Sequence, residues 1–278
     1  MKKLFVATDF SDVSLNAVNY AADLAVHLQA SLTIIHVYES PMFYTAEMPY
    51  TAIEAAENLA RTEADSKMNA LMKRMKQSHA SLAISEIIKR GISAETITET
   101  ADGEGADLLI AGATGAGVVE RTLVGSTTTA LINKSKCQVL IVPENATFKP
   151  ATKLVYTTDL KDDNIKAVND LIPFASSMNS ELIFLFVDDK IHTDSEKISE
   201  DMSSKIRQLV QYPKTSGYIC PDPTVMNGIS LFIEKQHVDM IAMLTHPRKF
   251  PQMLWDKSLT KKFSYHPNVP LLVLHANH

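Results

Sequence analysis

The chain has 278 residues, of which 45% are hydrophobic and 21% charged, and it carries a formal net charge of −5. This length accommodates two ordinary domains or one large one, and the composition is that of a globular protein with a buried core. The negative charge argues against a nucleic-acid binder, and neither a signal peptide nor an apolar run near the ~20 residues of a membrane span is evident. Cys137 and Cys220 show neither metal-ligand nor redox spacing, so a reduced, cytoplasmic protein is expected.

Short apolar runs alternate with helical periods along the first half of the chain. The runs predict strands at 4–8, 32–37, 84–89, 107–111 and 139–142. The periodic segments predict helices at 14–29, 52–77, 94–101 and 126–134. Strands that alternate with helices imply right-handed crossovers and a doubly wound parallel sheet.

The second half repeats the first. Residues 4–37 align with 154–187 without a gap, and Thr8/Thr158 and Asp9/Asp159 are among the identical pairs. The apolar segments 137–143 and 268–274 close the two copies. A repeat of about 150 residues is too long for a solenoid unit, so it indicates a duplicated domain.

We therefore predict an α/β protein of two tandem doubly wound domains, each with a five-stranded parallel sheet. Residues 1–146 and 151–278 would form the two domains, with the interrupted segment 144–152 between them. In the second copy, the middle helix at 195–211 is shorter and the third strand at 217–220 weaker.

Residues 39–50 form a second marked loop, because Pro41 and Pro49 stop regular structure. Its aromatic residues suit either a lid over a site or a flap on the neighbouring domain, and the sequence does not choose between them.

A glycine motif follows the fourth predicted strand. Gly112 and Gly115 are separated by two residues, and nine more precede Gly125-Ser126 at the start of a helix. Glycine lets backbone N–H groups approach an anion, and a helix N-terminus favours phosphate. The hydroxyl groups that could add hydrogen bonds are those of Thr114, Ser126, Thr127 and Thr128. Asp9, at the end of the first strand, should reach the same crevice.

The alternative is that these glycines are turn residues and Ser126 an ordinary helix cap. The coincidence of spacing, hydroxyl groups and Asp9 favours a phosphate site instead. Two other phosphate loops are excluded: the sequence from Gly115 fails as a dinucleotide fingerprint by context, and no Walker-type Gly-Lys-Ser/Thr occurs.

The order of these features resembles the universal stress protein family, in its ATP-binding branch. The likeness rests on strand–Thr8-Asp9-x-Ser11–helix, a strand ending in His36-Val37, and the Gly-x2-Gly-x9-Gly-Ser motif, and it spans the chain as two copies. It implies a Rossmann-like fold of the adenine-nucleotide alpha-hydrolase-like type and a cytoplasmic stress-response role. It also implies that the last strands pair, so that the tandem chain is an internal pseudo-dimer; a homodimer is left open. Phe10 departs from the family, in which glycine is common at this position.

The resemblance also implies the roles of the site residues. Ala7, Thr8 and Asp9 would face the adenosine, and the Val37 backbone would meet the base. Gly112, Gly115, Gly125, Ser126 and Thr127 would hold the phosphates. The full candidate site is Ala7, Thr8, Asp9, Ser11, Val37, Ala111, Gly112, Thr114, Gly115, Gly125, Ser126, Thr127 and Thr128, with ATP as its ligand, with or without Mg²⁺.

The second copy has lost this motif. Its fourth strand runs into Thr245-His246-Pro247, Lys257-Ser258 replaces Gly-Ser, and none of the glycines remains, although Asp159 does. We expect no ATP binding of the family type there. The basic stretch 248–262 suits a docking site for an anionic ligand or acidic partner, or simply a solvated face. The histidines show no metal-ligand spacing.

Three functions are compatible with these features. A nucleotide-binding switch is favoured, because the motif offers Arg121 and Asp9 but no convincing base and no lysine for phosphoryl transfer. A slow ATPase and a nucleotide-free interaction scaffold are the alternatives. The sequence names no protein partner.

Overall fold

The coordinates are a computed structural model that describes residues 1–39, 50–113, 125–158, 164–189, 204, 206, 210–245 and 269–275. The strands are β1 (Lys3–Ala7), β2 (Ser31–Tyr38), β3 (Ile84–Arg90), β4 (Leu108–Gly112), β5 (Gln138–Val142), β6 (Lys153–Thr157), β7 (Glu181–Asp188), β8 (Thr215–Pro221), β9 (Met240–Thr245) and β10 (Leu271–His275). The helices are α1 (Asp12–Leu28), α2 (Tyr50–Ser78), α3 (Ser93–Gly103), α4 (Ser126–Lys134), α5 (Asn164–Ser177) and α7 (Val225–Gln236).

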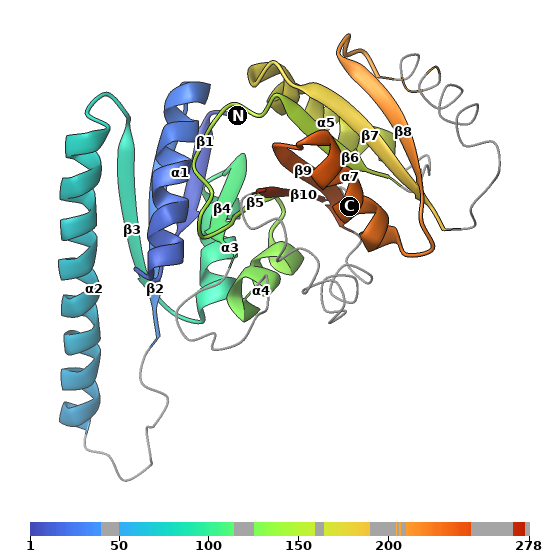
Figure 1. The fold of residues 1–278 in the computed structure, drawn as a ribbon. Coiled ribbons are helices and arrows are strands. Elements are labelled where there is room, and N and C mark those ends of the chain that lie inside the picture. The colour runs from blue at the N-terminus through green and yellow to red at the C-terminus, as the bar shows by residue number, and fades with distance from the viewer. Residues whose placement is uncertain are drawn as a thin grey trace.

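All ten strands join in one sheet, in the order β3-β2-β1-β4-β5-β10-β9-β6-β7-β8 (Figure 1). Neighbouring strands are parallel within each half, and β5 and β10 meet antiparallel at the centre. The predicted α/β fold class is thus confirmed, with the two five-stranded halves joined into a single sheet. The central contact is the pairing of last strands that the resemblance implied.

Strand side chains alternate between two apolar layers. Leu4 and Val6 pack in the layer that contains α1, α2 and α5, whereas Phe5 and Ala7 pack in the layer that contains α3, α4 and α7. A strand that is apolar on both faces must be covered on both faces, which explains the continuous hydrophobic runs of the sequence. Each layer extends across both halves of the chain, so the joined sheet shares its core.

Two aspartates make equivalent hydrogen bonds in the two halves. The Asp107 Oδ2 atom accepts hydrogen bonds from the backbone N–H groups of Lys2 and Lys3, at 2.5 and 3.0 Å. Asp239 Oδ2 accepts from those of Thr152 and Lys153, at 2.9 and 3.1 Å. Each carboxylate precedes the fourth strand of its half and anchors the start of the first, so the duplication extends to single hydrogen bonds.

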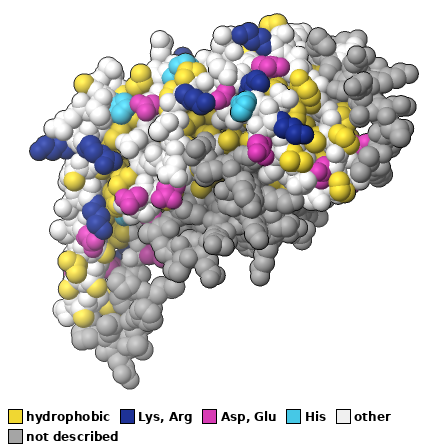
Figure 2. Space-filling view, in the orientation of Figure 1, with side chains coloured by type: hydrophobic (Ala, Val, Ile, Leu, Met, Phe, Trp, Pro, Cys, Tyr) yellow, Lys and Arg dark blue, Asp and Glu magenta, His cyan; other side chains and the backbone are white. Residues whose placement is uncertain are grey.

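The surface of the molecule carries mixed charges. Over the described residues of the face in Figure 2, Lys and Arg side chains are interspersed with Asp and Glu. That part of the surface therefore has no extended basic patch of the kind that binds nucleic acid. No described helix is long and apolar enough to cross a membrane.

Three sequence predictions fall wholly or largely outside the described residues: the 39–50 loop, the 195–211 helix and the 248–262 basic stretch. The segment 144–152 is described and contains neither helix nor strand. The division into domains 1–146 and 151–278 remains a proposal.

Candidate functional site

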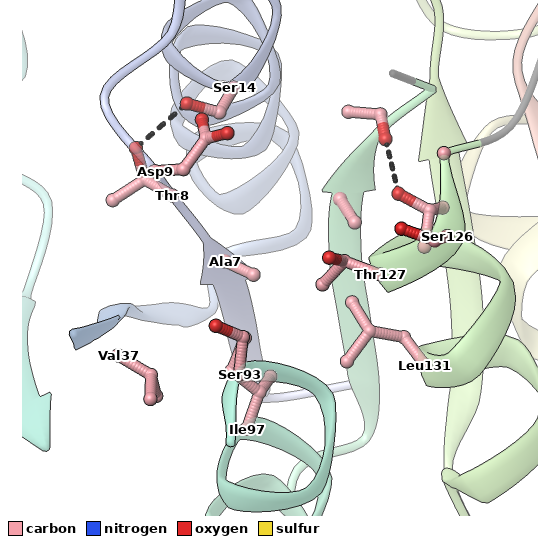
Figure 3. A pocket seen from close by; sticks show the side chains of 14 residues that line it. Ala7, Thr8, Asp9, Ser14, Val37, Ser93, Ile97, Ser126, Thr127 and Leu131 are labelled. Carbon is pink, nitrogen blue, oxygen red and sulfur yellow. Dashed lines mark hydrogen bonds between the residues drawn. The ribbon is translucent and has the colours of Figure 1, made fainter. Parts of the chain in front are cut away.

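A pocket opens at the carboxyl ends of β1, β2 and β4, between the starts of α3 and α4 (Figure 3). Parallel strands place their carboxyl ends at one edge, so segments far apart in the sequence meet there. The described lining residues are Ala7, Thr8, Asp9, Ser14, Val37, Ser93, Ile97, Ala111, Gly112, Gly125, Ser126, Thr127, Thr128 and Leu131.

Ten of the thirteen residues predicted from sequence line this pocket. They are Ala7, Thr8, Asp9, Val37, Ala111, Gly112, Gly125, Ser126, Thr127 and Thr128. Thr114 and Gly115 lie outside the described residues. Ser11 is not among the lining residues. The sequence reasoning missed Ser14, Ser93, Ile97 and Leu131.

Ser11 serves the pocket indirectly. Its side chain caps α1 by accepting from the Ser14 backbone N–H, at 3.3 Å. Its own backbone N–H and hydroxyl both donate to Asp9 Oδ1, at 3.0 and 2.5 Å. These contacts orient the Asp9 carboxylate at the pocket edge, so Ser11 acts as a positioning residue.

A compact polar network supports the end of β1. The hydroxyl groups of Thr8 and Ser14 lie 3.0 Å apart, buried, and Thr8 Oγ1 also accepts from the Phe10 N–H at 3.0 Å (Figure 3). Phe10 has a φ of 63°, in the left-handed region that favours glycine. Its ring lies 4.5 Å from that of His36. Phe10, which differs from the glycine common in the family, therefore adopts a backbone conformation that favours glycine. Its ring contact with His36 holds it there.

The start of α4 borders the opposite side of the pocket. Gly125 is the N-cap residue, and no side chain among the described residues is seen to cap this helix. The first-turn N–H groups of a helix have no helical acceptor, and its dipole favours an anion at that end. Ser126 and Thr127 stand in this turn and face the pocket (Figure 3).

Thr128 and Gly112 have structural partners of their own. The Thr128 hydroxyl donates to the Gly112 carbonyl oxygen at 2.9 Å, so its proton ties α4 to β4. A Cβ atom on Gly112 would lie 2.9 Å from Val13 Cγ1 and 3.1 Å from the Val13 carbonyl oxygen. Gly112 thus allows the close approach of α1 to β4, a packing requirement that its place in the motif did not reveal.

The wall that the sequence reasoning missed comes from α3. Ser93 and Ile97 lie one helical turn apart and both line the pocket. Val37 and Ile97 make this side largely apolar, and Leu131 of α4 adds an apolar side chain on the opposite side (Figure 3). The sequence shows the i, i+4 spacing of Ser93 and Ile97. It does not show that the start of α3 points toward the pocket.

The described lining residues include one carboxylate, Asp9, and no Lys, Arg or His. An anion would thus be held here by backbone N–H groups and hydroxyls. The described residues contain no group of three or more His, Cys, Asp or Glu that could hold a metal ion. The lining of the pocket thus combines apolar side chains with hydroxyl and backbone groups.

The second half keeps the strand arrangement of the first but lacks the glycine motif. The Thr158 N–H donates to Leu185 O at 3.0 Å, as the Thr8 N–H donates to Ile35 O at 2.9 Å. Register places Leu244 where the first half has Gly112, because Leu4 pairs with Leu108 and Leu154 with Met240. The second half therefore carries a leucine side chain where the first half has none. Asp159 lies outside the described residues.

The fold and pocket together define a Rossmann-like α/β protein whose candidate ligand site lies at the carboxyl edge of a parallel sheet. The universal stress protein family model matches residues 1–143. The chain therefore belongs to the universal stress protein family.

Individual relatives agree with this assignment. A universal stress protein of Methanocaldococcus jannaschii is 32% identical over 143 residues, which are 51% of this chain and 81% of that protein. A crystal structure of a universal stress protein from Archaeoglobus fulgidus has a TM-score of 0.66 and 16% identity, over 98% of this chain and 95% of that one. A putative universal stress protein from Pseudomonas aeruginosa has a TM-score of 0.57 and 14% identity, over 99% and 93%. These two structures share the fold across both halves.

Proposed function

We propose that the first half of the chain, residues 1–146, is a domain that binds ATP or a related adenine nucleotide, with or without Mg²⁺. The nucleotide would act as a switch that sets conformation or partner choice in a cytoplasmic stress-response protein. The second half, residues 151–278, would be a domain that serves as a built-in partner without an equivalent ATP site. The observation that carries this proposal is the meeting of ten predicted residues in one pocket.

The arrangement of the pocket supports a nucleotide in one orientation. Phosphates suit the uncapped start of α4, at Gly125, Ser126 and Thr127. A base suits the apolar side formed by Val37 and Ile97. Asp9 and Thr8 lie at the end of β1, within reach of the adenosine portion. The phosphates would thus meet hydrogen-bond donors, and the base would meet apolar side chains.

Binding without fast turnover is the favoured mode. Phosphoryl transfer to water needs a positioned nucleophile, a base and stabilisation of the developing charge. Among the described lining residues, Asp9 is the candidate base, and it already accepts two hydrogen bonds from Ser11. No described lining residue supplies a cation. Any ATPase activity is therefore expected to be slow.

Release of a co-purified ligand separates the candidate functions. The purified protein is heated, and the supernatant is analysed by ion-exchange chromatography. ATP supports the switch, ADP with phosphate supports a slow ATPase, and a supernatant without nucleotide supports a nucleotide-free scaffold. If no nucleotide is found, the protein is loaded with ATP and freed of unbound ATP before heating. This control shows whether the site is present and had lost its ligand during purification.

A further inference from the structure

A carboxylate stands behind the α3 wall of the pocket. Glu39 follows β2 and accepts two hydrogen bonds from Ser93, the first residue of α3: one from the hydroxyl at 3.0 Å and one from the backbone N–H at 3.5 Å. Both reach the same oxygen, Oε1. Ser93 itself lines the pocket, whereas Glu39 is exposed and is not among the described lining residues, so its carboxylate is linked to the pocket through Ser93.

This contact makes the two helix starts that border the pocket chemically different. The N-cap residue of α3, Ile92, makes no side-chain cap hydrogen bond, and Glu39, which follows β2, supplies an acceptor instead. The start of α4 has no side-chain cap in the part of the chain that the structure describes. A helix start already neutralised by a carboxylate repels a second anion, whereas an uncapped start attracts one. The pocket therefore favours an anion at α4 and disfavours one at α3.

The charge on Glu39 is balanced only by neutral donors in the described part of the chain. Its partners among the described residues are the Ser93 hydroxyl and N–H, which both bind one carboxylate oxygen. A carboxylate offers about four acceptor positions, so Oε2 retains capacity for a ligand hydroxyl. Glu95, in the first turn of the same helix, forms an ion pair with Lys134 instead.

Ser93 lies between the two ends of the pocket. In Figure 3 it stands between Val37, on the apolar side, and Thr127, at the start of α4. A nucleotide bound with its phosphates at α4 and its base near Val37 would bring its sugar past Ser93. Glu39 is thus placed to act on the ribose rather than on the terminal phosphates.

We infer that Glu39, held by Ser93, makes this pocket select nucleotides whose ribose carries free hydroxyl groups and reject those phosphorylated on the sugar. The inference rests on the proposed function, because it concerns the same pocket. The carboxylate accepts hydrogen bonds from ribose hydroxyls and repels a phosphate in their place. Glu39 is a specificity-determining residue in this scheme.

The test compares two isomers, ADP and adenosine 3′,5′-bisphosphate, which have the same base, sugar and number of phosphates. Calorimetry of the full chain should show ADP binding about tenfold more tightly. Glu39→Gln, which keeps an acceptor and removes the charge, should reduce this preference to about threefold or less. Ser93→Ala should weaken it, because Glu39 loses the donor that holds it. Glu95→Gln is the matched control and should keep the wild-type ratio.

The outcomes separate the two claims. A wild-type protein that binds neither nucleotide contradicts the proposed function, and the inference falls with it. A protein that binds ADP with a preference unchanged by Glu39→Gln contradicts the inference alone. Equal loss of the preference in Glu95→Gln would also contradict it, because any negative charge near α3 would then suffice. Thermal melting of each variant confirms that the compared proteins are folded.

Discussion

The Nδ1 atom of His36 lies 2.8 Å from the carbonyl oxygen of Thr8, and this contact joins the end of β2 to the end of β1 beside the pocket. The imidazole is half-buried, and its ring contacts that of Phe10 at an interplanar angle of 46°. Burial lowers the pKa of His36 below its ordinary value of 6.5 and outweighs the opposing effects of the Thr8 carbonyl and the Asp9 carboxylate, while Lys67 lowers it further.

Folding should therefore weaken in mild acid. The unfolded chain gains a proton at position 36 near pH 6.5, before the folded chain does, so the free energy of unfolding falls as the pH drops below about 6.5. His36→Asn can keep the donor to Thr8 but does not titrate. Urea titrations between about pH 7.5 and 5 should show a shallower dependence in this variant. Part of the dependence should remain, because burial also lowers the pKa of His275. An unchanged pH profile would exclude His36 as a source.

The left-handed conformation of Phe10 predicts an unusual substitution pattern. A non-glycine residue there costs about 1 kcal/mol, and the ring contact with His36 offsets part of that cost. Phe10→Ala loses the ring contact with His36 but keeps the backbone strain. Phe10→Gly loses the ring contact and the strain. The alanine variant should be the less stable of the two by about 1 kcal/mol in urea denaturation. Equal stabilities would indicate that the backbone is not strained.

Gly112 should tolerate no side chain. Alanine at this position would meet Val13 at 2.9 Å, so Gly112→Ala should lower the free energy of unfolding by about 1–3 kcal/mol. Gly103→Ala is the matched control, because a Cβ atom there has no neighbour within 4 Å. The control should be neutral or slightly stabilising. A harmless Gly112→Ala would show that α1 can move away from β4 without cost.

The paired aspartates should make equivalent contributions. Burial raises the pKa of Asp107, but backbone hydrogen bonds from Lys2 and Lys3 outweigh it, and the resulting pKa is below the ordinary 3.8. The pKa of Asp239 is lowered in the same way, with Lys149 and Thr152 as its main donors. These carboxylates stabilise the fold above about pH 3.8, and that stability is lost as the pH falls toward their folded pKa values.

Asp107→Asn and Asp239→Asn should each cost about 1–2 kcal/mol at pH 7, as measured by urea denaturation, and less near pH 3. Asp65→Asn, which removes an exposed pair with Arg61, should cost less than about 0.5 kcal/mol. A cost that stays constant with pH would contradict a role for the charge.

Much of the fold could be predicted from the sequence because its signals are local. The α4 bounds agree with the predicted 126–134, since a glycine begins the helix and periodic residues continue it. The repeat predicted two similar halves, and the family resemblance alone implied that their last strands, β5 and β10, would pair; the apolar layers shared across the joined sheet were not predicted. That union depends on pairing between distant segments, for which a single sequence holds no local signal.

The site was predictable where a motif marked it and not elsewhere. Asp9 and Gly125 stood out by their positions next to a strand and a helix. Ser93 and Ile97 did not stand out in this way. Their place in the pocket depends on the direction of the chain between β3 and α3, which no sequence motif marks. Ser11 was assigned to the pocket, but it lies two residues after Asp9 and its hydrogen bonds orient that carboxylate.

Calorimetric titration of the full chain with ATP tests the central claim most directly. The account predicts one site per chain, and loss of binding in Gly115→Val/Gly125→Val while the melting temperature stays close to that of the wild type. The reason is that a branched side chain would stand where backbone N–H groups should meet phosphate. Two equivalent sites, no binding by the wild type, or unchanged affinity in the variant would contradict the account.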